Sequence, residues 1–190
     1  MHRNHLQRPS WFQRGRYGPD FRDLPGGEQS LAGVTYWIAE DDQSSRPTVM
    51  ALAGHSTESA AESISVPVGR SADRLAFLHT AHVPGGTELK DGDALFHYRV
   101  AYVDGSSTDI PIRLGRQIAR WSQGRMRPIA DGRIAWAQKV AHKSLGGRRS
   151  YLHLYGYQWD NPKPDTEVAR IEILRDVDPL QATPAVFCSN

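Results

Sequence analysis

The segment RLAFLHT, residues 74–80, decides the fold because it predicts a strand that is buried on both faces. Its residues 75–78 are all apolar, with no alternation of polar and apolar positions. A strand with one solvated face alternates with a period of two, whereas a short continuous apolar run suits a strand that is covered on each side. We therefore expect residues 74–80 to lie at the centre of the molecule.

Similar short runs of apolar or alternating residues recur along the chain, separated by turn signals. Together with residues 74–80 they predict about ten strands. The further runs are residues 33–38, 48–53, 63–68, 95–103, 107–112, 134–140, 151–159, 168–174 and 185–188. Many short strands between turns are typical of a sandwich or barrel rather than of βαβ units. The predicted fold class is an all-β sandwich.

Two connections refine this prediction. Asp104-Gly105 separates two of the runs and is a hairpin signal. The long connection over residues 115–132 suits a crossover between two sheets, and it also suits a loop at the rim of a binding face. Only residues 114–121 carry apolar side chains at helical spacing, so we expect at most one short helix.

Length and composition indicate one globular domain over residues 23–190, preceded by a basic lead-in over residues 1–22. The 17 Gly and 12 Pro fit many turns, and the single Cys188 excludes an internal disulfide. The net charge is +2 with both signs mixed along most of the chain, so we expect no nucleic-acid partner. No run of 18 apolar residues occurs, so we expect no membrane span. The lead-in lacks the apolar stretch of a signal peptide, and the compartment stays open.

Catalytic motifs are incomplete. Residues 54–58 (GHSTE) begin like a nucleophile elbow but lack its second glycine. His79 and His82 stand three apart on a predicted strand, so their side chains point to opposite faces and cannot chelate one metal together. Residues 143–147 (KSLGG) resemble only part of a phosphate-binding loop. These patterns favour a non-catalytic protein.

Acidic residues in predicted turns suggest a calcium site. Loop carboxylates are hard oxygen ligands of the kind that Ca²⁺ prefers. The candidate ligands are Asp41, Asp42, Asp91 and Asp93. The same pairs, or Asp160 with Asp165, would serve a glycosidase if they faced each other across a sugar. Asp is also common in turns for backbone reasons, so these pairs have a plain structural interpretation as well.

Five tryptophans are candidates for stacking against sugar rings: Trp11, Trp37, Trp121, Trp136 and Trp159. A sugar site needs an apolar plate beside a few fixed polar groups. Trp159 ends a predicted strand and Trp121 lies in the long connection, so both could reach a rim. Core packing is the other interpretation for each, and it is the one we favour for Trp37 and Trp136.

Polar residues near these tryptophans complete a candidate binding surface. Arg113 closes a predicted strand and would either pair with a carboxylate or bind a sugar or uronate through its fork of donors. His153 alternates with Leu152 and Leu154, so it faces away from them, either outward or into a ligand face. His79 suits a hydrogen-bonded core histidine or a ligand contact.

Several motifs together resemble a galactose-binding-like jelly-roll module found in large bacterial carbohydrate-active proteins. The motifs are residues 66–70 (VPVGR), 72–75 (ADRL), 77–81 (FLHTA), 102–105 (YVDG), 110–113 (IPIR), 135–136 (AW) and 159–165 (WDNPKPD). The resemblance extends from about residue 21 to residue 174. It places His79, Arg113, Trp136, Trp159, Asn161 and Asp165 on the module's recurrent positions, whereas the basic loop over residues 143–149 departs from the pattern.

This resemblance implies a non-catalytic carbohydrate-binding or accessory module of a larger carbohydrate-active protein. Its partner would be a glycan or a catalytic domain of the parent protein. Ca²⁺ would be structural. Two alternatives remain: a protein-interaction β-sandwich without a sugar ligand, and a stand-alone polysaccharide hydrolase or lyase.

Overall fold

The computed structural model describes residues 21, 23–39, 49–52, 61–142, 148–178 and 180–187. Within these residues every regular element is a strand, and the strands form antiparallel sheets. The strands are β1 (Gly27–Leu31), β2 (Val34–Ile38), β3 (Val49–Ala51), β4 (Ser63–Arg70), β5 (Arg74–His82), β6 (Ala94–Tyr102), β7 (Ser107–Arg113), β8 (Ser122–Gln123), β9 (Arg133–His142), β10 (Arg148–Asp160), β11 (Val168–Arg175) and β12 (Thr183–Phe187). The all-β prediction is confirmed.

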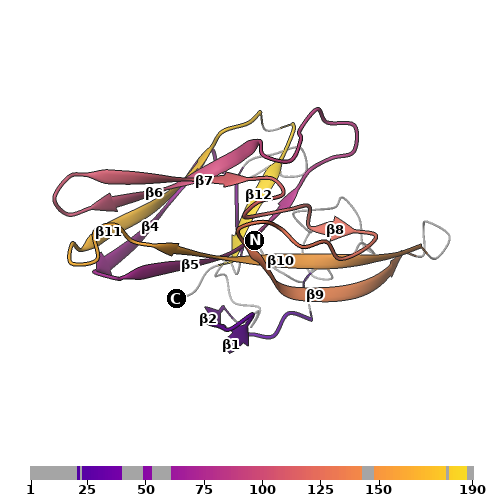
Figure 1. Cartoon of the computed structure of the whole chain (residues 1–190), viewed down its shortest axis with the longest axis horizontal. Coiled ribbons are helices and arrows are strands. Elements are labelled where there is room, and N and C mark those ends of the chain that lie inside the picture. Colours follow the sequence, from indigo (N-terminus) through magenta and orange to yellow (C-terminus); the bar gives the residue numbers. More distant parts are fainter. Residues whose placement is uncertain are drawn as a thin grey trace.

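Two sheets pack face to face in a sandwich-like arrangement (Figure 1). The larger sheet has the order β3-β12-β5-β10-β8, and β9 also pairs with β10. The smaller sheet has the order β4-β11-β6-β7. Phe77 of β5 stacks on Tyr98 of β6, with ring centroids 4.0 Å apart. The main core therefore lies between the two sheets, where burial of each large apolar side chain contributes roughly 1.5–3 kcal/mol.

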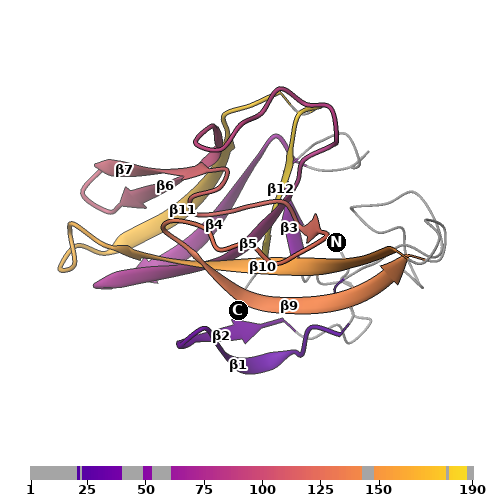
Figure 2. The same ribbon diagram turned by 45° about the vertical axis from the view of Figure 1, so that its right-hand side comes forward.

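A ribbon formed by β1 and β2 makes a third layer (Figure 2). It lies against the face of the larger sheet that points away from the main core, where Tyr36 and Ile38 join Leu152 and Leu154 in a second core cluster. Phe21 is buried in the same cluster, two residues before the predicted start of the domain. The larger sheet is therefore covered on both sides. Residues 77–81 of β5 are all buried, whereas Arg74 and Ala76 at the start of the predicted strand are exposed.

The predicted strands correspond to ten of the observed ones. β1 and β8 were not predicted, since GEQSL is mostly polar and Ser122-Gln123 is only two residues long. The hairpin at Asp104-Gly105 joins β6 to β7 as predicted, and the connection after β7 crosses from the smaller sheet to the larger one.

A short helix over residues 114–121 does not form, which corrects the sequence interpretation. Gly115 has a φ of +75°, outside the helical region, and its N–H donates to the carbonyl of Ile118 at 2.8 Å. Trp121 continues in extended form, because its N–H donates to the carbonyl of Ala81 and its own carbonyl accepts from the N–H of His153. Leu114 and Ile118 pack in the main core, whereas Trp121 packs in the second cluster on the other face of the larger sheet.

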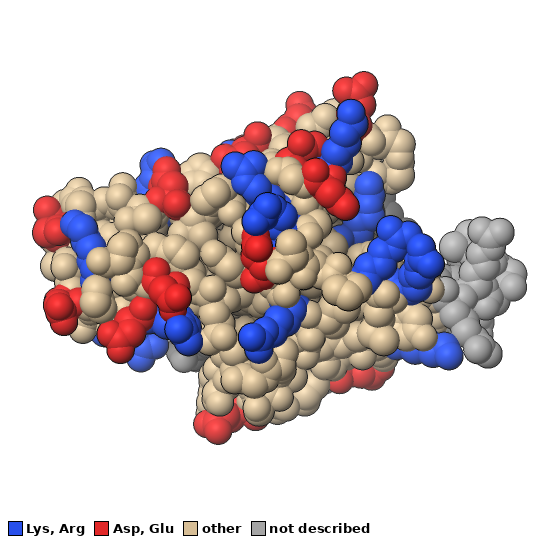
Figure 3. All heavy atoms as spheres, viewed as in Figure 1, with Lys and Arg blue, Asp and Glu red and all other residues tan. Residues whose placement is uncertain are grey.

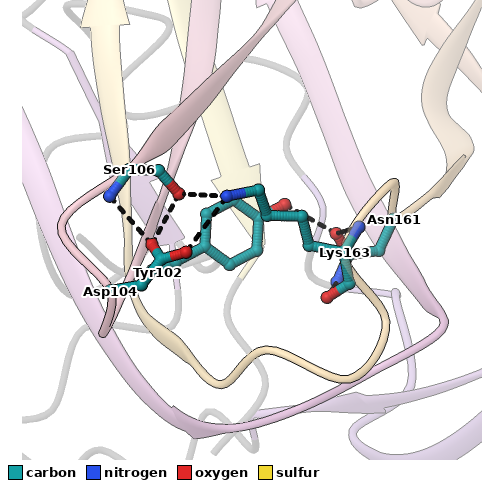
Figure 4. Close-up of polar contacts among 5 residues, drawn as sticks. All are labelled: Tyr102, Asp104, Ser106, Asn161 and Lys163. Carbon is teal, nitrogen blue, oxygen red and sulfur yellow. Dashed lines mark hydrogen bonds and ion pairs between the residues drawn. The ribbon is translucent and has the colours of Figure 1, made fainter.

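Asn161 ties the turn after β10 to the rest of the sandwich (Figure 4). Its Oδ1 accepts from the Tyr102 hydroxyl at 2.6 Å and from the N–H of Lys163, and its Nδ2 donates to the carbonyls of Ala72 and Lys163. The side chain is therefore fully hydrogen-bonded. Asn161, one of the recurrent positions of the resembled module, therefore caps backbone groups of this turn.

The same turn reaches the β6–β7 hairpin through Lys163. Its ammonium group donates to Asp104 at 3.1 Å and to the Ser106 hydroxyl at 2.7 Å, above the Tyr102 ring. Hydrogen bonds from the Ser106 hydroxyl, from the Ser106 N–H and from Lys163 lower the pKa of Asp104 to about 2. The motif WDNPKPD thus has a structural role at this end of the molecule.

Replacing Asn161 with alanine should destabilise the protein by about 2–3 kcal/mol, because the buried Tyr102 hydroxyl loses its acceptor and two carbonyls lose a donor. Urea denaturation would measure this loss. Lys163→Met is the matched control in the same turn, and it should cost less than about 1 kcal/mol because its ion pair is exposed. Equal costs for the two variants would contradict the assigned role of Asn161.

Candidate functional site

The predicted calcium ligands do not converge within the described residues. No group of three or more His, Cys, Asp or Glu residues there has an arrangement that could hold a metal ion. The Asp93 carboxylate accepts the N–H of Lys90 at 2.7 Å, which is a turn contact, and the Asp91 side chain lies against Gly115. Asp41 and Asp42 lie outside the described residues. The calcium site therefore stays a prediction.

His79 lies in the main core and is completely buried. Its Nε2 donates to the carbonyl of Gln117 at 3.0 Å, since a carbonyl can only accept, and its Nδ1 accepts from the Tyr98 hydroxyl at 3.0 Å. Burial lowers the pKa of His79 to about 4, although the bond to Gln117 opposes the shift. This geometry matches the core interpretation of His79.

His153 also lies inside the protein. It faces away from Leu152 and Leu154 as predicted, but it is fully buried, with the rings of Tyr151 and Tyr155 at centroid distances of 6.2 and 5.9 Å. Neither ring nitrogen has a hydrogen-bond partner in the described part of the chain, and burial lowers the pKa of the imidazole. His153 is therefore held neutral beneath the surface and does not present a ring to solvent.

The predicted sugar-stacking residues are not brought together. Trp121 is 6% exposed and packs in the second cluster, where its Nε1 donates to Nδ1 of His82 at 3.1 Å. Trp159 is half-buried against the main core, on the opposite face of the larger sheet. Trp136 is half-buried beside Phe21, with centroids 5.7 Å apart.

Arg113 lies at the end of β7, and its guanidinium donates to the carbonyl of Gly92 at 3.0 Å. Its backbone N–H is capped by the side chain of Gln117. One of its donors is therefore already used to hold the turn before β6. The candidate surface of Trp121, Trp159, Arg113 and His153 does not exist as one contiguous face.

Trp37 is the aromatic residue that the structure exposes, and its assignment to the core was wrong. Its side chain is 51% exposed on the outer face of the β1–β2 ribbon. Val34, Tyr36 and Ile38 alternate with it and face the sheet, so the period of two sends Thr35 and Trp37 outward. The alternation in VTYWI separates Trp37 from Val34, Tyr36 and Ile38, but it does not say which of the two faces is covered.

Polar side chains surround the Trp37 indole. Glu28 is its direct partner across the ribbon, and Ser30 pairs with Thr35 in the same register. All of these residues are exposed on the face of the ribbon that does not contact the sheet. We call Trp37, Glu28, Ser30 and Thr35 the ribbon platform, a flat apolar plate beside a carboxylate and two hydroxyl groups.

A separate open pocket of about 370 Å³ lies beside β8, lined by Gln123, Gly124, Arg125 and Arg127. Lys and Arg side chains gather over this part of the molecule in the space-filling view (Figure 3). The pocket belongs to the crossover connection that the sequence predicted as either a link between sheets or a binding rim. The crossover between the sheets is confirmed, and a binding role for this connection stays a prediction.

The chain matches no known protein-family model, and no curated protein or solved structure is significantly similar to it. Within the described residues no helix is long and apolar enough to cross a membrane.

The buried His79 makes stability depend on pH. Because its pKa falls from 6.5 to about 4 on folding, the unfolded chain binds the proton first as the pH drops. The contribution of His79 to the free energy of unfolding is complete above pH 6.5 and is lost as the pH falls toward 4. The loss is about 3 kcal/mol, at 1.36 kcal/mol per pKa unit. Urea denaturation of the wild type and His79→Gln between pH 7 and pH 4 would measure it. A pH slope that is unchanged in His79→Gln would contradict this assignment.

Proposed function

We propose that this protein is a non-catalytic carbohydrate-binding module with a galactose-binding-like jelly-roll fold, an accessory to a larger carbohydrate-active protein. The sandwich-like pair of antiparallel sheets is compatible with this fold. The family likeness of the motifs around residues 72–81 and 159–165 supports the same assignment. A structural Ca²⁺ in the Asp41–Asp42 or Asp91–Asp93 turns remains part of the proposal.

The single observation that carries the sugar-binding role is the exposed indole of Trp37. A large aromatic side chain in water forgoes the stabilisation that burial would provide, so its exposure calls for an explanation. A sugar presents an apolar C–H face and a rim of hydroxyl groups. The ribbon platform offers the complementary surface, because Trp37 supplies the plate and Glu28, Ser30 and Thr35 supply hydrogen-bonding groups around it.

The distribution of titratable groups favours binding over catalysis. A hydrolase needs convergent acids and bases in a cleft. The groups whose pKa shifts most by burial are His79, Tyr36 and Tyr155, and all three are enclosed in core clusters. Asp160, one of the candidate catalytic carboxylates, pairs with Arg74 on the exposed surface at 2.6 Å.

A protein-interaction role without a sugar has less support. Such a role calls for a contiguous exposed apolar patch of several hundred Å². The large exposed apolar residues in the described part of the chain are Trp37, Val103, Met126 and Leu180, and they come from different segments. Single side chains from separate segments do not make up such a patch.

Removing the Trp37 indole should abolish the binding of the protein to sugars. Affinity electrophoresis on a panel of neutral polysaccharides should show the wild type retarded, with a dissociation constant between millimolar and micromolar, roughly −4 to −8 kcal/mol. Trp37→Ala should lose this retardation, and Trp37→Tyr should keep part of it because the smaller ring still stacks. The indole is half exposed, so the midpoint of urea unfolding should move little.

Val103→Ala is the matched control, since it removes an apolar side chain of similar exposure from a distant hairpin. It should leave retardation unchanged. Uniform failure of the wild type to bind any polysaccharide would overturn the proposal, and so would undiminished retention in Trp37→Ala.

A further inference from the structure

The pocket beside β8 has two arginines that are not used by the fold. Guanidinium groups elsewhere are engaged: Arg116 pairs with Asp131, Arg99 with Asp109, and Arg120 donates to the carbonyls of Val83 and Pro84. Arg125 and Arg127 are exposed and have no ion pair or hydrogen bond within the described residues. Two unpaired cations on one concave wall favour an anionic ligand.

Gln123 adds a fixed acceptor to this wall. Its Nε2 donates to the carbonyl of Arg120 at 3.2 Å and to the Tyr155 hydroxyl at 2.9 Å. Because the Arg120 carbonyl can only accept, the amide nitrogen must face it, and Oε1 is the atom that remains to accept a hydrogen bond. The amide is therefore oriented before any ligand arrives, which lowers the entropic cost of binding.

The start of the pocket loop is anchored to the sheet. Ser122 and Gln123 pair with Leu152 and Tyr151 of β10, and the preceding residue bonds to both β5 and β10. Gly124 has open space where a Cβ would lie, and its φ is not positive. The pocket wall therefore begins on a rigid strand and continues in an exposed segment that admits a ligand close to the backbone.

We propose that this pocket binds the uronate residues of an acidic polysaccharide. A uronate combines a carboxylate, which a guanidinium can hold with two parallel hydrogen bonds, and hydroxyl groups, which can donate to the Gln123 Oε1. The volume of about 370 Å³ is at the lower end of the range for small-molecule sites, about 300–1,000 Å³, and suits one or two sugar rings. Nucleic acid is disfavoured because it needs an extended basic face rather than a concave site with two cations.

This site is independent of the ribbon platform. Gln123 bonds to Tyr155, which belongs to the main core, whereas the ribbon packs on the opposite face of the larger sheet with Leu152 and Leu154. The inference rests on the proposed carbohydrate-binding role only for the choice of a sugar acid over other anions. Its test can therefore succeed where that of Trp37 fails.

Isothermal titration of the whole chain with trigalacturonic acid tests the proposal. The double variant Arg125→Gln/Arg127→Gln should weaken binding at least tenfold. The control Arg74→Gln/Arg170→Gln changes the net charge by the same amount at exposed positions elsewhere and should change affinity less than twofold. Gly124→Leu should also weaken binding by filling the pocket without altering charge, and Gly124→Ala controls for the change of backbone.

Further ligands decide the chemical class. Neutral trigalactose should bind at least tenfold more weakly than trigalacturonic acid in this pocket, and Trp37→Ala should leave the Arg-dependent part of the uronate affinity intact. Equal losses in the two double variants would overturn the proposal, because they would show a non-specific effect of charge. Tighter binding of inorganic phosphate or of a single-stranded oligonucleotide than of the uronate would overturn it as well.

Discussion

The structure depends on the burial of β5 from both sides. Residues 77–81 of β5 are buried without a break, so neither face of the strand is left in water there and the sheet has two covers. The smaller sheet provides the first cover through the stacked Phe77 and Tyr98. The ribbon and Phe21 provide the second, in contact with the residues that alternate with Phe77. The three layers follow from this one requirement.

The same requirement explains the polar groups in the interior. A sheet covered on both sides buries whatever polar residues its strands carry, and these must find partners or remain uncharged. His79 is neutral and bonded at both nitrogens, and Asn161 is saturated by four hydrogen bonds. Among the described residues His153 has no hydrogen-bond partner for its ring nitrogens, and it lies between the rings of Tyr151 and Tyr155.

The strands could be predicted from sequence because each carries its own periodicity. The candidate site could not be predicted, because the exposure of its side chains depends on the third layer, the β1–β2 ribbon. The alternation of Val34, Tyr36 and Ile38 was visible, yet the outward position of Trp37 followed only once β1 was known, and β1 is a polar segment without a strand signal. The extended conformation of Trp121 was missed because its segment has helical spacing. The positive φ of Gly115 interrupts a helix, and Trp121 bonds to Ala81 of β5 and His153 of β10 instead. The clustering of Arg125 and Arg127 was hidden by a net charge averaged over the whole chain.

Both proposed binding surfaces lie on parts of the chain that serve the core on one side only. The ribbon needs its inner face to cover the larger sheet, which leaves the outer face with Trp37 free of any packing requirement. The crossover buries Ile118 in the main core and Trp121 in the second cluster, and its residues 122–123 pair with β10, which leaves Arg125 and Arg127 outside both clusters. Side chains in such positions can change without loss of the fold. This is why we propose that they contact ligands. The exposed Trp37 indole forgoes the stabilisation of burial, and the guanidinium groups of Arg125 and Arg127 are not used by the fold. This is the physical reason for assigning these groups to ligands rather than to the core.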